Sequence, residues 1–85
     1  MERVNENLVR EFAKLLKQRR KMAGLSQEEL AFRADLSVSY ISLLETSNRQ
    51  PTLTVIHALC EQLDISLVEF FQQLEDHMTE ADRKT

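Results

Sequence analysis

The sequence predicts an all-α protein, a compact bundle of five helices. Along most of the chain, apolar residues recur at spacings of three and four, which is the period of amphipathic helices and not of strands. A hydroxyl or amide residue able to cap a helix precedes each such segment. With 85 residues there is room for one hydrophobic core, so we expect a single domain over residues 1–85 with its core at about 8–72.

The first predicted helix spans about residues 5–23. Asn5 or Asn7 can cap its start, and basic residues crowd its end, where the helix dipole favours them. Gly24, the single glycine, supplies a left-handed residue that stops the helix. The predicted apolar stripe consists of Leu8, Phe12, Leu15, Leu16 and Met22.

Two short helices follow, at about 26–35 and 37–45. Ser26 and Glu29 have the spacing of a capping box, and Ser37 can cap the second helix. Neither helix is long enough to be stable alone, so both need a scaffold from the rest of the chain. We expect the second helix, beginning near Val38, to be presented to a partner. The inward residues are predicted to be Leu30, Ala31, Ala34, Ile41 and Leu44.

Residues 46–51 are predicted to form a polar loop, in which Asn48 suits a left-handed backbone position. A fourth helix, capped by Thr52 and ending at Asp64, is predicted to bury Leu53, Ile56, Leu59, Cys60 and Leu63. A fifth helix opens with a second capping box, Ser66 and Glu69, and extends to about residue 81, with a frayed tail after Asp82. Its apolar side consists of Leu67, Phe70, Phe71, Leu74 and Met78.

The net charge of −3 is unevenly distributed. Residues 1–50 carry nine basic and seven acidic side chains, whereas residues 51–85 carry two basic and seven acidic. An acidic second half would point away from a phosphate backbone, which is compatible with DNA binding. One cysteine, no apolar run near the length of a membrane span and no signal-peptide pattern favour a cytoplasmic protein without a membrane partner.

An ordered set of short motifs runs between about residues 12 and 71. The motifs are GLSQEELA at 24–31, LS at 36–37, YIS at 40–42, Glu45 with Pro51 six residues later, and LDIS at 63–66. In this order and spacing, the set resembles the XRE-type (Cro and phage-repressor-like) helix-turn-helix family. The resemblance implies a bundle of the phage-repressor DNA-binding-domain type, in which the second and third helices form the helix-turn-helix.

The resemblance also implies which residues would touch DNA. Val38, Ser39, Ser42 and Leu43 would face the bases in the major groove. Phosphate contacts would come from Ser26, Gln27, Ser37, Tyr40, Asn48 and Arg49. The alternative is that these side chains are ordinary surface, and for Tyr40 half-buried packing. Short side chains read bases weakly, so the positions are predicted but the operator sequence is not.

Two further structural features follow from the resemblance. Arg20 and Glu45 would form a partly buried ion pair that locks the third helix to the scaffold. Asp35, Ser47 and Asp64 stand where relatives commonly carry glycine. Aspartate tolerates left-handed backbone better than most residues, so Ser47 fits its turn least well.

The last helix is longer than a minimal five-helix core requires. DNA readers of this type commonly bind twofold sites as dimers, so we expect a homodimer contact at Phe71, Leu74 and Met78. The alternative is that these residues complete the core of the monomer. Phe32 is a second oddity, since it falls on a helix face that should be polar.

No enzyme, metal site or cofactor is expected. His57 and His77 lie on separate predicted helices without a partner at ligand spacing, and Cys60 should be an inert core thiol. The expected function is a sequence-specific DNA-binding transcriptional regulator, a repressor that binds a twofold operator as a homodimer. The alternative is a protein-interaction module or antitoxin-like partner protein with weak or no DNA binding. The residues do not distinguish a phage-type repressor, a restriction-modification controller and an antitoxin.

Overall fold

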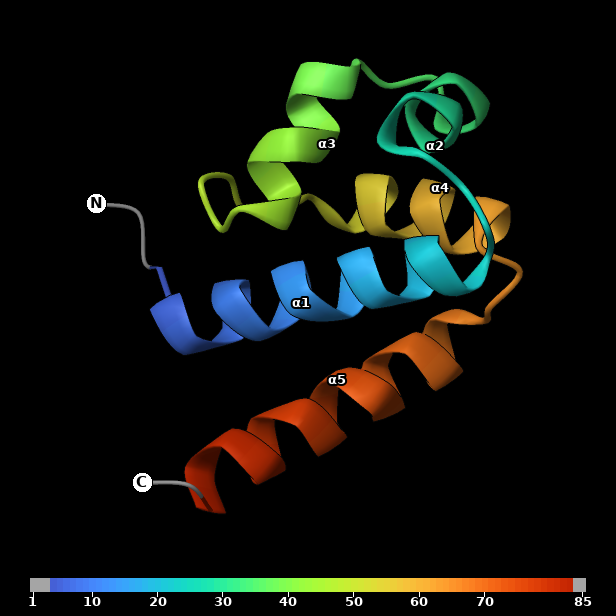
Figure 1. Cartoon of the computed structure of the whole chain (residues 1–85). Helices are drawn as coiled ribbons and strands as arrows, with labels where there is room; N and C mark the ends of the chain where they lie inside the picture. The colour runs from blue at the N-terminus through green and yellow to red at the C-terminus, as the bar shows by residue number, and fades with distance from the viewer. Residues whose placement is uncertain (1–3, 84–85) are drawn as a thin grey trace.

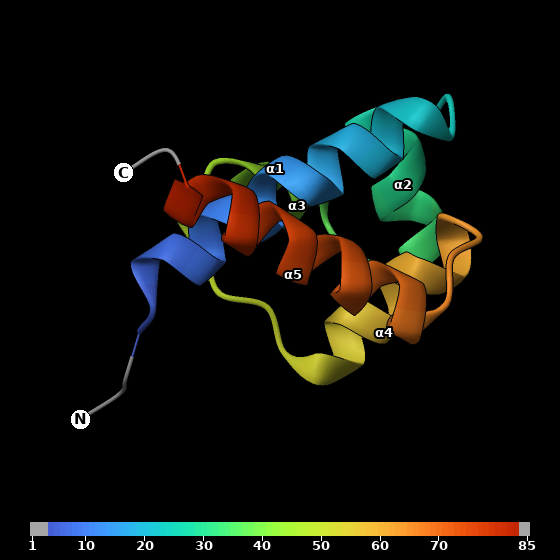
Figure 2. The same cartoon turned by 90° about the horizontal axis from the view of Figure 1, so that it is seen from below.

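The computed structural model describes residues 4–83, and the predicted all-α fold with five helices is confirmed. The helices are α1 (Glu6–Met22), α2 (Gln27–Ala34), α3 (Val38–Glu45), α4 (Leu53–Gln62) and α5 (Leu67–Arg83). In Figure 1, α1 runs through the middle of the molecule, with α2 and α3 on one side and α5 on the other. Helix α4 packs against both α2 and α5. The view in Figure 2 shows α5 crossing α1.

Side-chain caps set where the helices begin. The side chain of Asn5 accepts a hydrogen bond from the amide of Leu8 at 3.1 Å, and Thr52 accepts one from the amide of Val55 at 3.2 Å. At the start of α5 the predicted capping box forms only in part. The Ser66 hydroxyl accepts from the amide of Glu69, but the Glu69 carboxylate bonds that hydroxyl and not the backbone amide.

The helix ends agree with the sequence with two exceptions. Gly24 has φ +72° and closes α1, and Asp35, Ser47 and Asp64 have φ values of 57°, 64° and 53°. Asn48 was predicted to be left-handed, which is wrong, because Ser47 takes that conformation and the Asn48 amide bonds the carbonyl of Leu43 at 2.9 Å. Helix α5 continues to Arg83, beyond its predicted end, and residues 84–85 of the predicted frayed tail lie outside the described part of the chain.

One apolar core joins all five helices. Leu16, Leu30, Ile41 and Leu44 are fully buried, and the rings of Phe12 and Phe70 meet edge to face at 5.7 Å. Burying each of these aliphatic side chains contributes roughly 1.5–3 kcal/mol. The core holds α3 through its inner face only, which leaves the outer face of that helix available.

Three residues predicted to be buried are exposed. Leu8, Met22 and Leu53 have exposed fractions of 40%, 65% and 76%. All three lie in the first or last turn of their helices, where fewer neighbouring helices cover them. In α1 the buried face instead includes Val9, Ala13 and the carboxylate-bearing Glu11.

Candidate nucleic-acid interface

Helix α3 presents one of its faces outward. Ile41 and Leu44 have no exposed surface and fix the inner face of the helix. At 3.6 residues per turn, the four predicted base-reading positions share the opposite face. Val38 and Ser39 are exposed, while Ser42 and Leu43 are half-buried. The structure therefore brings Val38, Ser39, Ser42 and Leu43 together on one short, uncharged surface.

The acidic side chains of α3 and α5 lie away from this surface. Glu45 is the one charged residue of α3, and its side chain is only 2% exposed. Helix α5 carries five acidic residues and one arginine, and it lies on the far side of α1 from α3 (Figure 1). A phosphate backbone approaching α3 would therefore meet little repulsion from α5.

An ion pair ties the end of α3 to the end of α1. Arg20 donates from Nε to Glu45 Oε2 at 2.7 Å and from Nη2 to Glu45 Oε1 at 3.0 Å. Its remaining guanidinium nitrogen donates to the carbonyl of Leu25 at 2.8 Å. The hydrogen bond with Glu45 raises the pKa of Arg20 above its usual value, although burial acts in the opposite direction. Both side chains are nearly buried, and the pair connects the end of α3 to the end of α1.

Gln27, the first residue of α2, joins the same ion pair. Its side-chain nitrogen donates to Glu45 Oε1 at 3.0 Å. Gln27 was predicted to lie near phosphates, but its contact with Glu45 was not predicted. Little in the sequence indicates this contact, because it depends on the fold bringing Gln27 and Glu45, 18 residues apart, to the same place beside Arg20. The contact links the start of α2 to the end of α3.

Ser26 and Ser37, two predicted phosphate contacts, act as helix caps. Their hydroxyl oxygens accept from the amides of Glu29 and Tyr40 at 3.0 and 3.1 Å. Glu29 completes the first capping box by accepting from the Ser26 amide at 3.1 Å, and this bond lowers the pKa of its carboxyl. Each serine keeps its hydroxyl hydrogen as a potential donor to a phosphate oxygen.

The other predicted phosphate contacts, Tyr40, Asn48 and Arg49, differ in their exposure and in their hydrogen-bond partners. Tyr40 is half-buried and packs against the core, which fits its predicted alternative as well. The Asn48 side chain donates to the carbonyl and the hydroxyl of Thr46, at 3.2 and 2.8 Å. Arg49 is exposed, and no hydrogen bond or ion pair from its guanidinium is found within residues 4–83. A role for Thr46 was not predicted: its hydroxyl donates to the carbonyls of Ser42 and Leu43, as threonines near helix ends often do.

The predicted dimer residues occupy different environments. Leu74 is 8% exposed and belongs to the core, in line with the alternative that it completes the monomer. Phe71 is 38% exposed and Met78 is half-buried. Val68, three residues before Phe71 on α5, is 80% exposed and extends the same apolar side.

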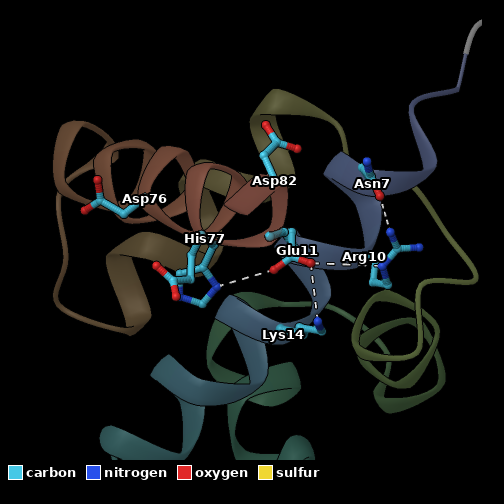
Figure 3. Close-up of a pocket in the computed structure, with 9 residues that line it drawn as sticks. Asn7, Arg10, Glu11, Lys14, Asp76, His77 and Asp82 are labelled. Carbon is cyan, nitrogen blue, oxygen red and sulfur yellow. Dashed lines mark hydrogen bonds and ion pairs between the residues drawn. The ribbon is translucent and has the colours of Figure 1, made fainter. Parts of the chain in front are cut away.

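A groove on the other side of the molecule lies between the start of α1 and the end of α5, with a volume of about 670 Å³. Figure 3 shows Glu11 at its centre, with Lys14 at 3.3 Å and His77 of α5 at 3.8 Å. The lining carries both signs of charge and is distant from α3. Within residues 4–83, no group of three His, Cys, Asp or Glu side chains could hold a metal ion.

A helix that crosses a bilayer must be both long and apolar, and no helix within residues 4–83 meets both conditions.

The geometry of α2 and α3 defines a class of protein. Two short helices are joined by a tight turn at Asp35, the first is capped by Ser26, and the second exposes one polar and aliphatic face. This is the arrangement of a helix-turn-helix protein. The chain belongs to the helix-turn-helix family, whose model matches residues 16–70. The resemblance drawn from the sequence motifs is confirmed.

Two curated relatives carry names that describe regulators. The chain is 40% identical over 50 residues to the uncharacterized HTH-type transcriptional regulator y4dJ of Sinorhizobium fredii (strain NBRC 101917 / NGR234), a match that spans 59% of the chain and 65% of that protein. It is 33% identical over 72 residues to the control protein C.MunI of a Mycoplasma species, spanning 85% of the chain and 97% of the relative.

The chain is also similar to solved structures of a restriction-modification controller protein. The wild-type restriction-modification controller protein C.Esp1396I superposes with a TM-score of 0.80 at 29% identity, over 85% of this chain and 95% of that one. The tetramer of that controller in complex with its natural 35 base-pair operator superposes with a TM-score of 0.79 at 29% identity, over the same shares of the two chains. The family is one of DNA-binding regulators and not of enzymes.

Proposed function

We propose that this protein is a sequence-specific transcriptional regulator that binds a twofold DNA operator as a homodimer. The observation that carries the proposal is the outer face of α3, which is formed by Val38, Ser39, Ser42 and Leu43. The ion pair of Arg20 and Glu45 connects the end of this helix to α1. A rigid helix with a neutral outer face can enter the major groove and contact base edges. The protein acts by occupying its operator in the cytoplasm and catalyses no reaction.

Each base-reading residue has a distinct chemical capacity. Val38 is exposed and suits contact with a thymine methyl group. Ser39 and Ser42 can donate or accept a hydrogen bond, and Leu43 adds apolar surface beside them. Arg49 and the free amides at the starts of α2 and α3 hold the phosphates and set the register on the duplex.

The comparisons favour one biological role among the three left open by the sequence. C.MunI is named a control protein, and C.Esp1396I is a restriction-modification controller solved as a tetramer on its operator. We infer that this chain is a regulator of the same kind, a controller that governs the expression of genes next to its own. Repression through operator occupancy is the simplest mechanism for a helix-turn-helix domain of this size.

The homodimer is proposed to form through the exposed apolar side of α5. Phe71 and Met78 lie on this side together with Val68, and all three retain exposed surface. Leu74, on the same helix, is buried in the monomer core beneath these residues. A twofold arrangement would place two α3 helices on successive major grooves of one operator.

Selection of bound DNA tests this function. Short fragments covering the region around the protein's own gene are incubated with the full chain, and the bound fraction is sequenced. The expected result is one enriched segment containing two inverted half-sites. Ser39→Ala and Ser42→Ala should relax the enriched sequence at specific positions, whereas Arg49→Ala should weaken binding without changing that sequence. Enrichment of no segment, with a bound partner protein instead, contradicts the proposal and supports the interaction-module alternative.

A further inference from the structure

A second groove lies where the end of α1, the helix α2 and the turn between α4 and α5 meet, and it has a volume of about 380 Å³. Figure 1 and Figure 2 both show the turn after α1 and the turn between α4 and α5 at the same end of the molecule. None of the residues predicted to contact DNA lines this groove. Its lining includes Arg19, Met22, Arg33, Leu63 and Asp64.

Arg19, in the last turn of α1, holds a buried donor that lacks an acceptor. Its Nε atom is buried, and no hydrogen-bond partner for it is found within residues 4–83. Buried donors are nearly always paired, because an unpaired one destabilises the folded state. The Arg19 side chain as a whole is only half-buried, so a ligand in the groove can reach its guanidinium. An acceptor bound there would satisfy this donor.

Arg33 brings a second guanidinium to the same groove from α2. The side chain is exposed, and its charge acts on Glu29, four residues earlier on the helix. No hydrogen bond or ion pair from the Arg33 guanidinium is found within residues 4–83. The planar fork of a guanidinium matches the two oxygens of a carboxylate. Two arginines from different helices therefore offer donors to one acidic group.

The other lining residues restrict the kind of acid that fits. The two arginines and Asp64 together carry a net charge of +1 (two positive, one negative), which suits a ligand with a single negative charge. Met22 is exposed and Leu63 is buried beneath the surface, so they offer apolar contacts beside the charges. Such a combination of a few polar groups and apolar surface is typical of small-molecule sites. A phosphate ion has no part that could use the apolar contacts.

We propose that this groove binds a small organic acid with one carboxylate and an apolar portion. The carboxylate accepts hydrogen bonds from Arg19 and Arg33, and the apolar portion packs on Met22 and Leu63. The inference goes beyond the proposed function and does not depend on it. A ligand held by both arginines joins α1 to α2, so it stabilises the folded chain in proportion to its occupancy.

The test titrates the full chain at pH 7 with three probes, benzoate, its uncharged analogue benzamide and inorganic phosphate. Backbone amide signals in NMR spectra report where each probe binds. Benzoate should bind with a dissociation constant on the order of 1 mM and shift the signals of Met22, Arg33 and Leu63. Benzamide should bind at least about tenfold more weakly, because it lacks the charge that strengthens hydrogen bonds from arginine. Phosphate should also bind more weakly than benzoate.

Four variants locate the site. Arg19→Gln and Arg33→Gln should each weaken benzoate binding about tenfold. Arg10→Gln is the matched control, since Arg10 lies at the start of α1 and lines a different groove. Asp64→Asn should tighten benzoate binding about threefold, because it removes a like charge. Asparagine also tolerates the φ of 53° at this position, so the turn should be retained.

The gain of affinity in Asp64→Asn separates a binding site from damage to the fold, which could only reduce binding. Three results would overturn the inference: no saturable shift with benzoate, equal binding of benzoate and benzamide, or phosphate binding as tight as benzoate. Benzoate affinity that falls as much in Arg10→Gln as in Arg19→Gln would show attraction to arginines in general and would overturn it as well. Thermal unfolding of Arg19→Gln without ligand should match the wild type, because its guanidinium makes no hydrogen bond within residues 4–83.

Discussion

Arg20 and Glu45, 25 residues apart in sequence, form a two-pronged ion pair that joins the last turn of α1 to the last residue of α3. The two side chains are 10% and 2% exposed. Arg20 also donates to the Leu25 carbonyl in the turn before α2. The pair therefore connects α1, the turn before α2 and the end of α3 at one point.

Breaking this pair on one side should cost more than removing it entirely. Arg20→Met or Glu45→Met alone leaves a buried charge without its partner and should lower the free energy of unfolding by about 3 kcal/mol. The double variant should be less destabilised than either single variant, which corresponds to a coupling energy of at least about 3 kcal/mol in a double-mutant cycle. Chemical denaturation of the wild type, the two single variants and the double variant measures this coupling energy.

The exposed pair of His57 and Glu61, 3.8 Å apart, provides the control cycle. Both side chains are about 60% exposed (59% and 61%), so their coupling should be close to zero. Additive effects of the Arg20 and Glu45 replacements would show that the pair does not hold α3 in place.

Acid should weaken the first turn of α2. The Ser26 amide holds the pKa of the Glu29 carboxyl below its usual range. A carboxyl whose pKa is lower in the folded state stabilises the fold above its unfolded pKa, and that contribution disappears as the pH falls through the folded pKa. Glu29→Ala should therefore be less stable than the wild type at neutral pH, with a gap that narrows below about pH 4. Thermal melts across this pH range test the prediction, and a gap independent of pH would contradict it.

Cys60 should be unreactive in the folded protein. Its side chain lies in the core at 2% exposure, and burial raises the pKa of the thiol to about 11. The reactive thiolate is therefore a fraction of only ~10⁻⁴ at pH 7. Alkylation by iodoacetamide, followed by mass spectrometry, should be slow in buffer and complete in denaturant. Labelling of the native chain at the rate of a free cysteine would be inconsistent with this core position.

A charge on the exposed apolar side of α5 should separate the proposed dimer. Phe71→Asp places a carboxylate in the contact, where its desolvation disfavours association. Sedimentation equilibrium should show the dimer dissociation constant rising at least about tenfold, which corresponds to about 1.4 kcal/mol. Phe32→Asp changes an aromatic side chain that is 88% exposed on α2 and should leave the dimer intact. If both variants associate like the wild type, the dimer contact lies elsewhere.

The fold was predictable because local and tertiary signals agree. Ser26, Ser37 and Thr52 cap helices where the spacing of apolar residues says that helices begin. The three turns at Asp35, Ser47 and Asp64 keep the left-handed geometry although none of them contains glycine. Aspartate and serine pay a modest conformational penalty there, which the surrounding packing overcomes.

The site was less predictable where it depends on contacts between distant segments. The bond from Gln27 to Glu45 and the burial of Glu11 against α5 follow from how helices pack, which helical periodicity does not specify. Leu53 illustrates the same limit, since its spacing matches the buried stripe of α4 but its place at the helix start leaves it in solvent. Periodicity identifies a face of a helix and not how far a neighbouring helix covers it.

The affinity of the protein for the selected operator, measured as a function of salt concentration, tests whether α3 binds DNA. The wild-type affinity should fall steeply with salt, with a log–log slope of roughly −0.9 for each phosphate contacted, and Arg49→Ala should make the slope less negative by about one. Fluorescence anisotropy of a labelled duplex measures both slopes under the same conditions. If no duplex from the gene's own neighbourhood binds even at low salt while a co-purifying protein does, the protein is an interaction module and not a DNA reader.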